Sequence, residues 1–372
     1  MTIAAFRQTE PPVPITRPMI DDDDLEAVAS VLRSGMLVQG PHVAQFEHRL
    51  ASMAGTAHAI AVSNCTVALE LALRGMGIGV GDRVAVTAYS WVATVNAIEI
   101  VGAEPVMIDI DGATFNMSVD ALDAAMHARP VHAVLPVHTF GNMSGFDELM
   151  ALTQSRGVPV LEDAACAIGA KSGLGSAGGI GVAGCLSFHP RKVITTGEGG
   201  AITTNDDKLA EFARTYRNHG QSAGGFTACG SNFRLTDFQA ALGVSQLDKL
   251  DGIVAERQRI AELYDAELPA LGMQPQLRGV GSVVQSYVAL VPASHSATAV
   301  VDGLRALGVE ATIGTVAIPF TPYHGTRFAA DPSAFPRLAD VQRRGVTLPL
   351  FPGMTADQQA RVLTALETVL RS

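Results

Sequence analysis

The sequence has few aromatic residues and few charged ones. Of its 372 residues, 5% are aromatic and 17% are charged, while 48% are hydrophobic. This composition argues against long disordered segments and indicates a chain that buries a large core. The formal net charge of -10 would repel a phosphate backbone, so we expect no nucleic-acid partner.

Cysteines are also few. Cys65, Cys166, Cys185 and Cys229 are far apart and form no CxxC pair, which predicts neither a metal site nor a disulfide framework. A reducing cytoplasm is therefore the simplest setting. Residues 1–14 contain no apolar stretch long enough for a secretory signal, so nothing indicates export. The longest stretch without charged residues, 279–301, contains a proline and several polar residues. We interpret it as strand, turn and helix start, and expect no membrane span.

The chain is longer than the size at which one hydrophobic core usually stops growing, so we expect two structural units. Short β-rich runs alternate with helical runs through the first two-thirds of the chain, which is typical of an α/β fold. Because these runs are nearly continuous in apolar residues, they predict a mostly parallel sheet flanked by helices on both faces. The expected strands are residues 58–62, 83–88, 104–109, 132–138, 158–164, 184–188 and 201–204.

The texture of the sequence changes near Gly272. A long helix is predicted over residues 235–268, and after it two strands and two helices form a smaller α+β unit. These strands are expected at 283–292 and 345–352, and the helices at 296–309 and from Ala356 onward. We therefore divide the chain into a large domain, residues 1–250, and a small C-terminal domain, residues 251–372. The acidic run from Asp21 to Asp24 predicts a helix start, because carboxylates favour the positive end of a helix dipole.

Polar residues follow the predicted strands at their carboxyl ends, where open α/β sheets bind ligands. After the first strand, Ser63, Asn64 and Thr66 lead directly into a helix. The N-terminus of that helix can hold a phosphate, or the three residues can simply cap the helix. Asp163 ends another apolar strand, where a buried carboxylate needs a partner. That partner could be a protonated pyridine nitrogen, an arginine or a helix terminus.

Lys192 lies near His189 and Arg191 in a segment rich in glycine, residues 187–206. A desolvated lysine near another cation loses its proton readily, which imine formation with an aldehyde requires, although most lysines are solvated surface residues. Two GxGxxG matches, at 173–178 and 179–184, raise the alternative of a nicotinamide-dependent oxidoreductase. Neither match opens a helix in the first βα unit, which argues against a dinucleotide site.

Taken together, these segments resemble the DegT/DnrJ/EryC1/StrS family of pyridoxal-phosphate (PLP)-dependent sugar aminotransferases. The resemblance covers nearly the whole chain and is carried by residues 15–47, 62–73, 160–170, 187–200, 230–247 and 348–355. It implies the PLP-dependent transferase fold type I, pyridoxal 5'-phosphate as cofactor, and a homodimer with shared active sites. The implied reaction transfers an amino group from L-glutamate or a similar donor to the keto group of a sugar, such as a nucleotide-linked keto-deoxysugar. Amino-sugar or natural-product biosynthesis is the implied setting.

The resemblance also implies roles for individual residues. Lys192 would form the Schiff base with the cofactor and shuttle the proton, while Asp163 would pair with the pyridine nitrogen. Trp91 would stack on the cofactor ring. The phosphate would be bound by the N–H groups of Cys65 and Thr66, at the start of the helix that follows the first strand, and by the hydroxyl of Ser187. Asn232 of the other subunit would reach the same phosphate.

This chain departs from the family pattern at three positions. Cys65 stands where the family commonly has glycine, Cys166 where it has glutamine or histidine, and Ser231 where it has tyrosine. Residues 317–325 contain His324 but lack the histidine that the family often has near the substrate, so the acceptor is open to alternatives such as a ketocyclitol or another keto intermediate.

Two further alternatives are a PLP-dependent sugar dehydratase and a non-catalytic regulatory protein of the same fold. Dehydratases of the family carry histidine in place of the lysine, so Lys192 favours transamination. The presence of both Lys192 and Asp163 argues against a non-catalytic protein, although a fold alone never guarantees activity.

Overall fold

The computed structural model describes residues 11–371. Residues 1–10, which form most of the segment in which we expect no secretory signal, lie outside the described residues. Within residues 11–371, no helix is both long enough and apolar enough to cross a membrane. All four cysteines fall inside this range, and each is free.

The expected strands form the central sheet. Four of them are ordered β1-β9-β8-β5 and three are ordered β3-β2-β4, and parallel bridges from β4 and its flank to the β5 region join the two sets. Strand β9 runs antiparallel to both of its neighbours, whereas the remaining pairs are parallel, so the sheet is mostly parallel as predicted. The strands are β1 (His58–Val62), β2 (Arg83–Thr87), β3 (Glu104–Ile108), β4 (Ala133–Leu135), β5 (Leu161–Asp163), β8 (Ala183–Ser187) and β9 (Gly200–Thr204).

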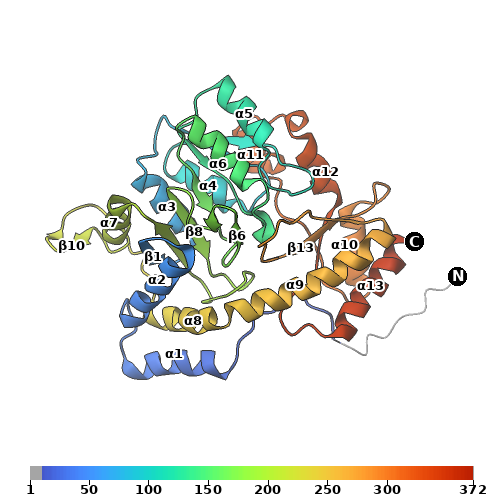
Figure 1. Ribbon diagram of the computed structural model, residues 1–372, viewed down its shortest axis with the longest axis horizontal. Coiled ribbons are helices and arrows are strands. Elements are labelled where there is room, and N and C mark those ends of the chain that lie inside the picture. Colours follow the sequence, from blue (N-terminus) through green and yellow to red (C-terminus); the bar gives the residue numbers. More distant parts are fainter. Residues whose placement is uncertain (1–10, 372) are drawn as a thin grey trace.

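Helices cover both faces of this sheet, as Figure 1 shows. Successive side chains of a strand point to opposite faces, and in β1 the adjacent residues Ala59 and Ile60 belong to two different apolar clusters. One cluster includes side chains of α2 (Pro41–Ala54), α5 (Val119–Ala128) and α6 (Phe146–Ser155). The other includes side chains of α3 (Cys65–Gly75), α4 (Ala93–Ile100) and α7 (Asp207–Tyr216).

The acidic run begins a helix, as predicted. Asp21 is the N-cap of α1 (Asp22–Ser34) and forms a capping box with Asp24. The predicted helix over 235–268 is two helices, α8 (Asp237–Asp248) and α9 (Leu250–Glu267). The N–H of Lys249 donates to the carbonyl of Gln246, three residues back, which interrupts the regular α-helical hydrogen bonding. In Figure 1 the two helices follow one another across the lower part of the molecule, with α8 above α1.

The C-terminal part contains a second, antiparallel sheet ordered β12-β13-β15-β14. Its strands are β12 (Gln274–Pro275), β13 (Tyr287–Leu290), β14 (Thr312–Ile313) and β15 (Gly345–Leu348). Its helices are α10 (Ala297–Ala306), α11 (Pro322–Arg327), α12 (Pro336–Arg344) and α13 (Ala356–Leu370), so the uncharged stretch 279–301 is a strand, a turn and a helix start. Val13, from the other end of the chain, is buried in the apolar core of this part.

Two short hairpins complete the elements that bear on the site. One consists of β6 (Lys171–Ser172) and β7 (Gly175–Ser176), and the other of β10 (Gln221–Ser222) and β11 (Gly225–Phe226). The second hairpin projects from the molecule beside α7 (Figure 1).

Candidate active site at the carboxyl ends of the strands

The carboxyl ends of three strands meet at one edge of the central sheet. Val62 at the end of β1 and Ser187 at the end of β8 both pair with Gly200 of β9. Asp163 at the end of β5 is in register with Cys185 of β8. The sequence therefore places its candidate residues at the edge where open α/β sheets bind ligands.

Lys192 lies half-buried in the loop between β8 and β9. Its N–H donates to the carbonyl of His189 at 2.8 Å, and its Nζ lies 3.1 Å from Sγ of Cys166. Burial lowers the pKa of Lys192, but the interactions with Cys166 and Asp163 raise it more, so the pKa lies above its ordinary value. The direction of this pKa is opposite to the expectation that Lys192 loses its proton readily, because the thiol and the carboxylate outweigh burial.

Asp163 is 3% exposed and receives one hydrogen bond at each carboxylate oxygen. Oγ1 of Thr94 donates to Oδ2 at 2.7 Å, and the N–H of Ala165 donates to Oδ1 at 3.1 Å. Within the described residues, no arginine is among its hydrogen-bond or ion-pair partners, so the arginine alternative is not supported. A buried carboxylate that lacks a cation in contact suits a protonated ring nitrogen.

Helix α3 begins directly after β1, close to these residues. The side chain of Asn64 is its N-cap and accepts from the N–H of Val67 at 3.0 Å, which is the capping role that the sequence left open. Cys65 and Thr66 are the first two residues of α3, so their N–H groups precede any intrahelical acceptor and can bind an anion. A Cβ on Gly200 would come within 2.6 Å of the nitrogen of Cys65, so this close approach requires glycine.

The other predicted site residues differ in exposure. Ser187 is buried at the end of β8, whereas Trp91, just before α4, is 64% exposed and leaves much of its ring open to a ligand. The carbonyl of Trp91 accepts from the N–H of Thr94, so the ring belongs to the turn that also binds Asp163. Asn232 is exposed between β11 and α8, and no contact within the described chain joins it to the residues above. Its reach into the site of another subunit stays a prediction.

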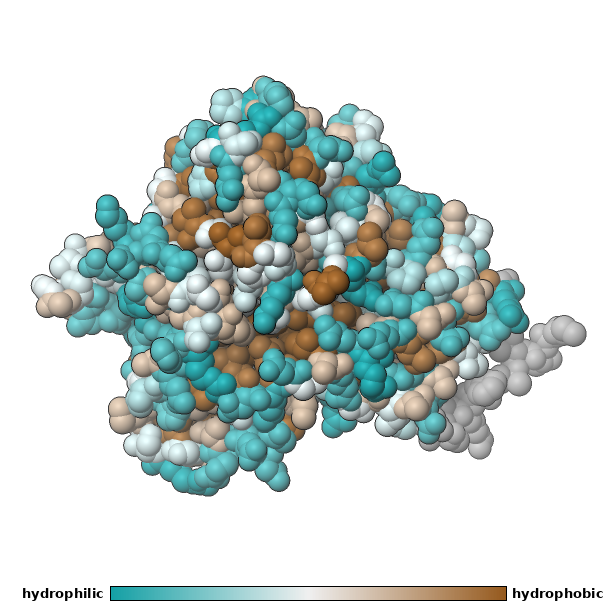
Figure 2. Space-filling model, in the orientation of Figure 1, coloured by the Kyte–Doolittle hydropathy of each residue, from teal (hydrophilic) through white to brown (hydrophobic). Residues whose placement is uncertain are grey.

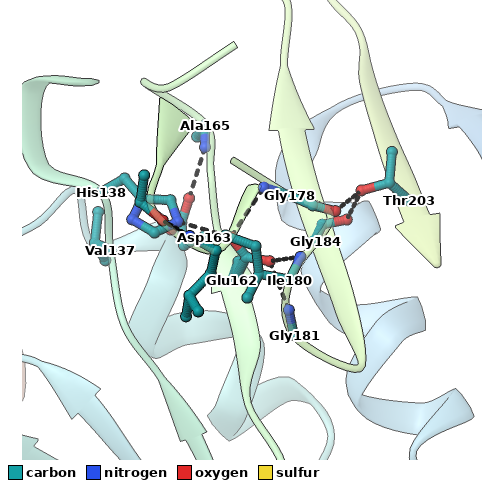
Figure 3. A network of polar contacts seen from close by, with 12 residues as sticks. Val137, His138, Glu162, Asp163, Ala165, Gly178, Ile180, Gly181, Gly184 and Thr203 are labelled. Carbon is teal, nitrogen blue, oxygen red and sulfur yellow. Dashed lines mark hydrogen bonds and ion pairs between the residues drawn. The ribbon is translucent and has the colours of Figure 1, made fainter. Parts of the chain in front are cut away.

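Glu162 precedes Asp163 on β5 and therefore points to the opposite face of the sheet. It is fully buried, and Nε2 of His138 donates to its Oε2 at 2.9 Å. Three backbone N–H groups also donate to this carboxylate at 2.7–2.9 Å (Figure 3): those of Gly178, Ile180 and Gly181. Burial raises the pKa of Glu162, but the bond and charge of His138 and the N–H donors lower it more, so it lies below its ordinary value.

These donors belong to the two GxGxxG segments that raised the nicotinamide alternative. Their N–H groups bind a carboxylate of the protein itself, and residues 171–176 form the hairpin of β6 and β7. The glycine-rich segments are therefore a structural cradle for Glu162, and they do not open a helix that could receive a dinucleotide phosphate.

Sequence reasoning missed three contacts of this site. It did not find the bond from Thr94 to Asp163, the buried pair of Glu162 with His138, or the approach of Cys166 to Lys192. A glutamate within an apolar run was a signal for the second contact. Hydroxyl residues are too common for Thr94 to stand out.

The site residues fit one kind of cofactor. The amine of Lys192 suits an aldehyde, and the buried carboxylate of Asp163, which has no contacting cation, suits a basic ring nitrogen. The N–H groups of Cys65 and Thr66 at the start of α3 suit a phosphate. Together with the mostly parallel sheet and the smaller antiparallel sheet, they define a PLP-dependent transferase of fold type I.

The chain belongs to the DegT/DnrJ/EryC1/StrS aminotransferase family, whose model matches residues 18–367. It is similar to the spore coat polysaccharide biosynthesis protein SpsC of Bacillus subtilis, with 34% identity over 96% of this chain and 97% of the relative. It is also similar to GDP-perosamine synthase of Caulobacter vibrioides, with 34% identity over 97% of this chain and 99% of the relative. A putative sugar aminotransferase from Streptococcus pneumoniae, solved in its PLP form, has a TM-score of 0.90 and 25% identity, and covers 97% of this chain and 99% of its own. The protein is a PLP-dependent aminotransferase.

Proposed function

We propose that this aminotransferase moves an amino group from L-glutamate, or a similar donor, to the keto group of a nucleotide-linked keto-deoxysugar. The observation that carries the proposal is the meeting of Lys192, Asp163 and the N-terminus of α3 at one edge of the sheet. The names of the two relatives with 34% identity, which concern GDP-perosamine and a spore coat polysaccharide, support a sugar as the acceptor.

The residues of this edge can hold PLP in one orientation. The N–H groups at the start of α3 and the hydroxyl of Ser187 would bind the phosphate, and Trp91 would cover the ring. Asp163 would face the ring nitrogen, while Nζ of Lys192 would bond to the aldehyde carbon. The N–H donors are those of Cys65 and Thr66. When bound, PLP supplies an electron-accepting ring that stabilises negative charge at the donor's α-carbon.

The chain itself supplies the proton transfers. Nζ of Lys192, as the free amine, takes the proton from the α-carbon of the donor, and in the second half-reaction it gives a proton to the former keto carbon of the acceptor. Asp163 would present its carboxylate to the ring nitrogen at the strand end, where hydrogen bonds from Thr94 and Ala165 orient it. Cys166 accepts a hydrogen bond from Nζ of Lys192 and so holds the amine when it is free.

We also propose a homodimer in which Asn232 of one subunit reaches the phosphate of the other. Large apolar side chains are exposed on α1 and on both of its flanks. Figure 2 shows a second apolar surface in the middle of one face, just above α8. A second copy would cover such a surface. The exposed apolar residues of α1 and its flanks are Met19, Ile20, Leu25, Leu32, Met36, Leu37 and Val38.

Two further expectations belong to this proposal. The free cysteines suit the cytoplasm as the place of action. The chain would divide into a large domain of residues 1–250 and a small domain of residues 251–372, because the core around the C-terminal sheet is built almost entirely from residues after 250. A further apolar cluster, which includes Tyr89 and Val288, packs the two parts together.

The test combines the PLP-loaded enzyme with L-glutamate and a panel of acceptors. Release of 2-oxoglutarate is measured with a nucleotide-linked keto-deoxysugar, with a ketocyclitol and with no acceptor, and the aminated product is identified by mass spectrometry. We expect one equivalent of 2-oxoglutarate without acceptor and continued turnover with the nucleotide-linked sugar. Turnover with the ketocyclitol alone would replace the proposed acceptor class, and the absence of any 2-oxoglutarate would overturn L-glutamate as donor.

A further inference from the structure

Three buried side chains form a chain of hydrogen bonds that ends on Asp163. Oγ of Ser90 lies 2.9 Å from Oγ1 of Thr94, which lies 2.7 Å from Oδ2 of Asp163. Their exposed fractions are 5%, 1% and 3%. The three residues come from the segment after β2, from the first turn of α4 and from the end of β5, so the chain of bonds ties three elements together.

The direction of both bonds follows from the chemistry of the groups. A hydroxyl carries one proton, and a carboxylate can only accept. The hydroxyl of Thr94 therefore donates its one proton to Asp163, and the hydroxyl of Ser90 must donate to the oxygen of Thr94. The two hydroxyl dipoles are thus aligned toward the carboxylate, and such aligned bonds strengthen one another in a buried site.

The second oxygen of the carboxylate is held as well. Oδ1 of Asp163 accepts from the N–H of Ala165, so one donor fixes each oxygen and the plane of the carboxylate is set. The N–H of Ala165 is a backbone donor that any residue except proline would supply, whereas the hydroxyl donor depends on the side chain at position 94. Without that hydroxyl, Oδ2 would lose its donor and the carboxylate could turn.

We propose that Thr94 and, through it, Ser90 are positioning residues that hold the carboxylate of Asp163 toward the ring nitrogen of the cofactor. This inference rests on the proposed pairing of Asp163 with that nitrogen. Thr94 would lie beside the ring, because its N–H donates to the carbonyl of Trp91, the residue proposed to cover that ring. One turn of the chain therefore offers both the covering ring and the hydroxyl that orients the charge.

A purely structural role predicts a different outcome. If Thr94 only joined α4 to β5, its removal would lower stability without changing the protonation of the cofactor. The two roles are separated by NMR of PLP that carries labelled nitrogen in its ring, because the resonance of that nitrogen reports directly whether it holds a proton.

The experiment compares five variants, each as PLP-loaded full-length protein. Thr94→Val removes the hydroxyl at nearly constant shape, and Thr94→Ser retains it. Ser90→Ala removes the second hydroxyl, and Asp163→Asn removes the charge. The matched control is Thr153→Val, because Thr153 is buried in α6 and its hydroxyl binds the carbonyls of Leu149 and Met150 in its own helix.

We expect the wild type, Thr94→Ser and Thr153→Val to show a protonated ring nitrogen. Thr94→Val should move the resonance toward the unprotonated value, Ser90→Ala should move it part of the way, and Asp163→Asn should give the unprotonated value. The dissociation constant of PLP, read from quenching of Trp91 fluorescence, should rise about tenfold in Thr94→Val, because a hydrogen bond to a charged group is lost.

Two results would count against the account, and they are distinguishable. If Asp163→Asn loses the proton while Thr94→Val and Ser90→Ala keep the wild-type resonance and affinity, the positioning role is overturned and the pairing of Asp163 stands. If Asp163→Asn keeps the protonated resonance, the proposed pairing itself fails. Ser90→Ala, which leaves the bond to Asp163 in place, provides the test should Thr94→Val fold poorly.

Discussion

Nζ of Lys192 lies 3.1 Å from Sγ of Cys166, and Cys166 follows Asp163 by three residues. The turn after β5 therefore carries both the carboxylate that would face the cofactor ring and the thiol that contacts the amine. A thiol is a weak hydrogen-bonding group, so the contact with Cys166 holds the amine less firmly than an amide or carboxylate oxygen would.

Replacement of Cys166 by alanine is expected to lower the pKa of Lys192. The thiol raises this pKa, so its loss leaves burial less opposed, and a larger fraction of the amine is neutral at a given pH. The neutral amine is the form that attacks an aldehyde. The rate of PLP capture by cofactor-free Cys166→Ala should therefore rise near neutral pH, and its pH profile should move to lower pH.

Stopped-flow absorbance across a pH series measures this rate. Cys229→Ala is the matched control, since Cys229 is an exposed free cysteine in the segment between β11 and α8. A profile of Cys166→Ala that moves to higher pH, or coincides with that of the control, would contradict the assignment of the thiol as a partner of Lys192.

Trp91 gives a direct optical test of the cofactor site. The chain has one tryptophan, Trp91, and this residue is 64% exposed beside the site. Addition of PLP to the cofactor-free protein should quench its fluorescence, because the two rings would stack. Trp91→Ala should bind PLP about tenfold more weakly, the loss of roughly 1.4 kcal/mol expected for an aromatic contact. Trp91→Phe should retain most of the affinity, and an unquenched tryptophan in the PLP-loaded protein would show that Trp91 does not cover the ring.

Glu162→Gln should lower the free energy of unfolding by about 3 kcal/mol, because it breaks a buried charged cluster and sets an amide group against backbone N–H donors. Urea unfolding of wild type and variant measures the difference. The pKa of Glu162 is lower in the folded protein than its ordinary value. Its contribution is therefore fully present above that ordinary value and is lost as the pH falls through the folded pKa.

The stability difference between wild type and Glu162→Gln should accordingly shrink in acid, below the ordinary pKa of a glutamate at roughly 4.3. Glu198→Gln is a suitable control, since Glu198 is an exposed glutamate. A difference that stays constant or grows as the pH falls would show that the charge of Glu162 does not stabilise the fold.

Asp237 caps a helix to which it does not belong. It is 1% exposed at the start of α8, and its Oδ1 accepts from the N–H groups of Gly40 and Val43 at the start of α2. Gly40 has no capping side chain of its own. Asp237→Ala should therefore lower the free energy of unfolding by about 2 kcal/mol. Asp248→Ala, which changes an exposed carboxylate of the same helix, should have little effect, and equal losses in both variants would refute the capping role.

The parts of the fold that depend on local sequence were predictable. Apolar runs located the strands, and polar residues at their ends located Asp163 and Ser187 at one edge. The contact of Thr94 with Asp163 spans 69 residues, and nothing local in the sequence marks it. The break at Lys249 was equally hidden, because one tightened turn leaves the apolar periodicity of the helices unchanged.

The glycine-rich segments show why a motif can mislead. A Cβ at Gly181 would lie 2.5 Å from the carbonyl oxygen of Val160, and one at Gly184 would lie 2.2 Å from Cα of Gly178. These glycines are required because backbone packs against backbone around Glu162. The same spacing serves dinucleotide phosphates elsewhere because that role also needs close backbone approach. The GxGxxG pattern therefore indicates a close approach to the backbone, but it does not tell whether a phosphate or another part of the protein makes that approach.

The central claim is that Lys192 binds the cofactor covalently and is released by the amino donor. Borohydride reduction of the PLP-loaded protein, followed by peptide mass spectrometry, tests it directly because reduction fixes the carbon–nitrogen bond. We expect the cofactor on the peptide that contains Lys192, no label in Lys192→Ala, and loss of label when L-glutamate is added before the borohydride. Label on a different lysine, or label at Lys192 that L-glutamate does not diminish, would contradict the account.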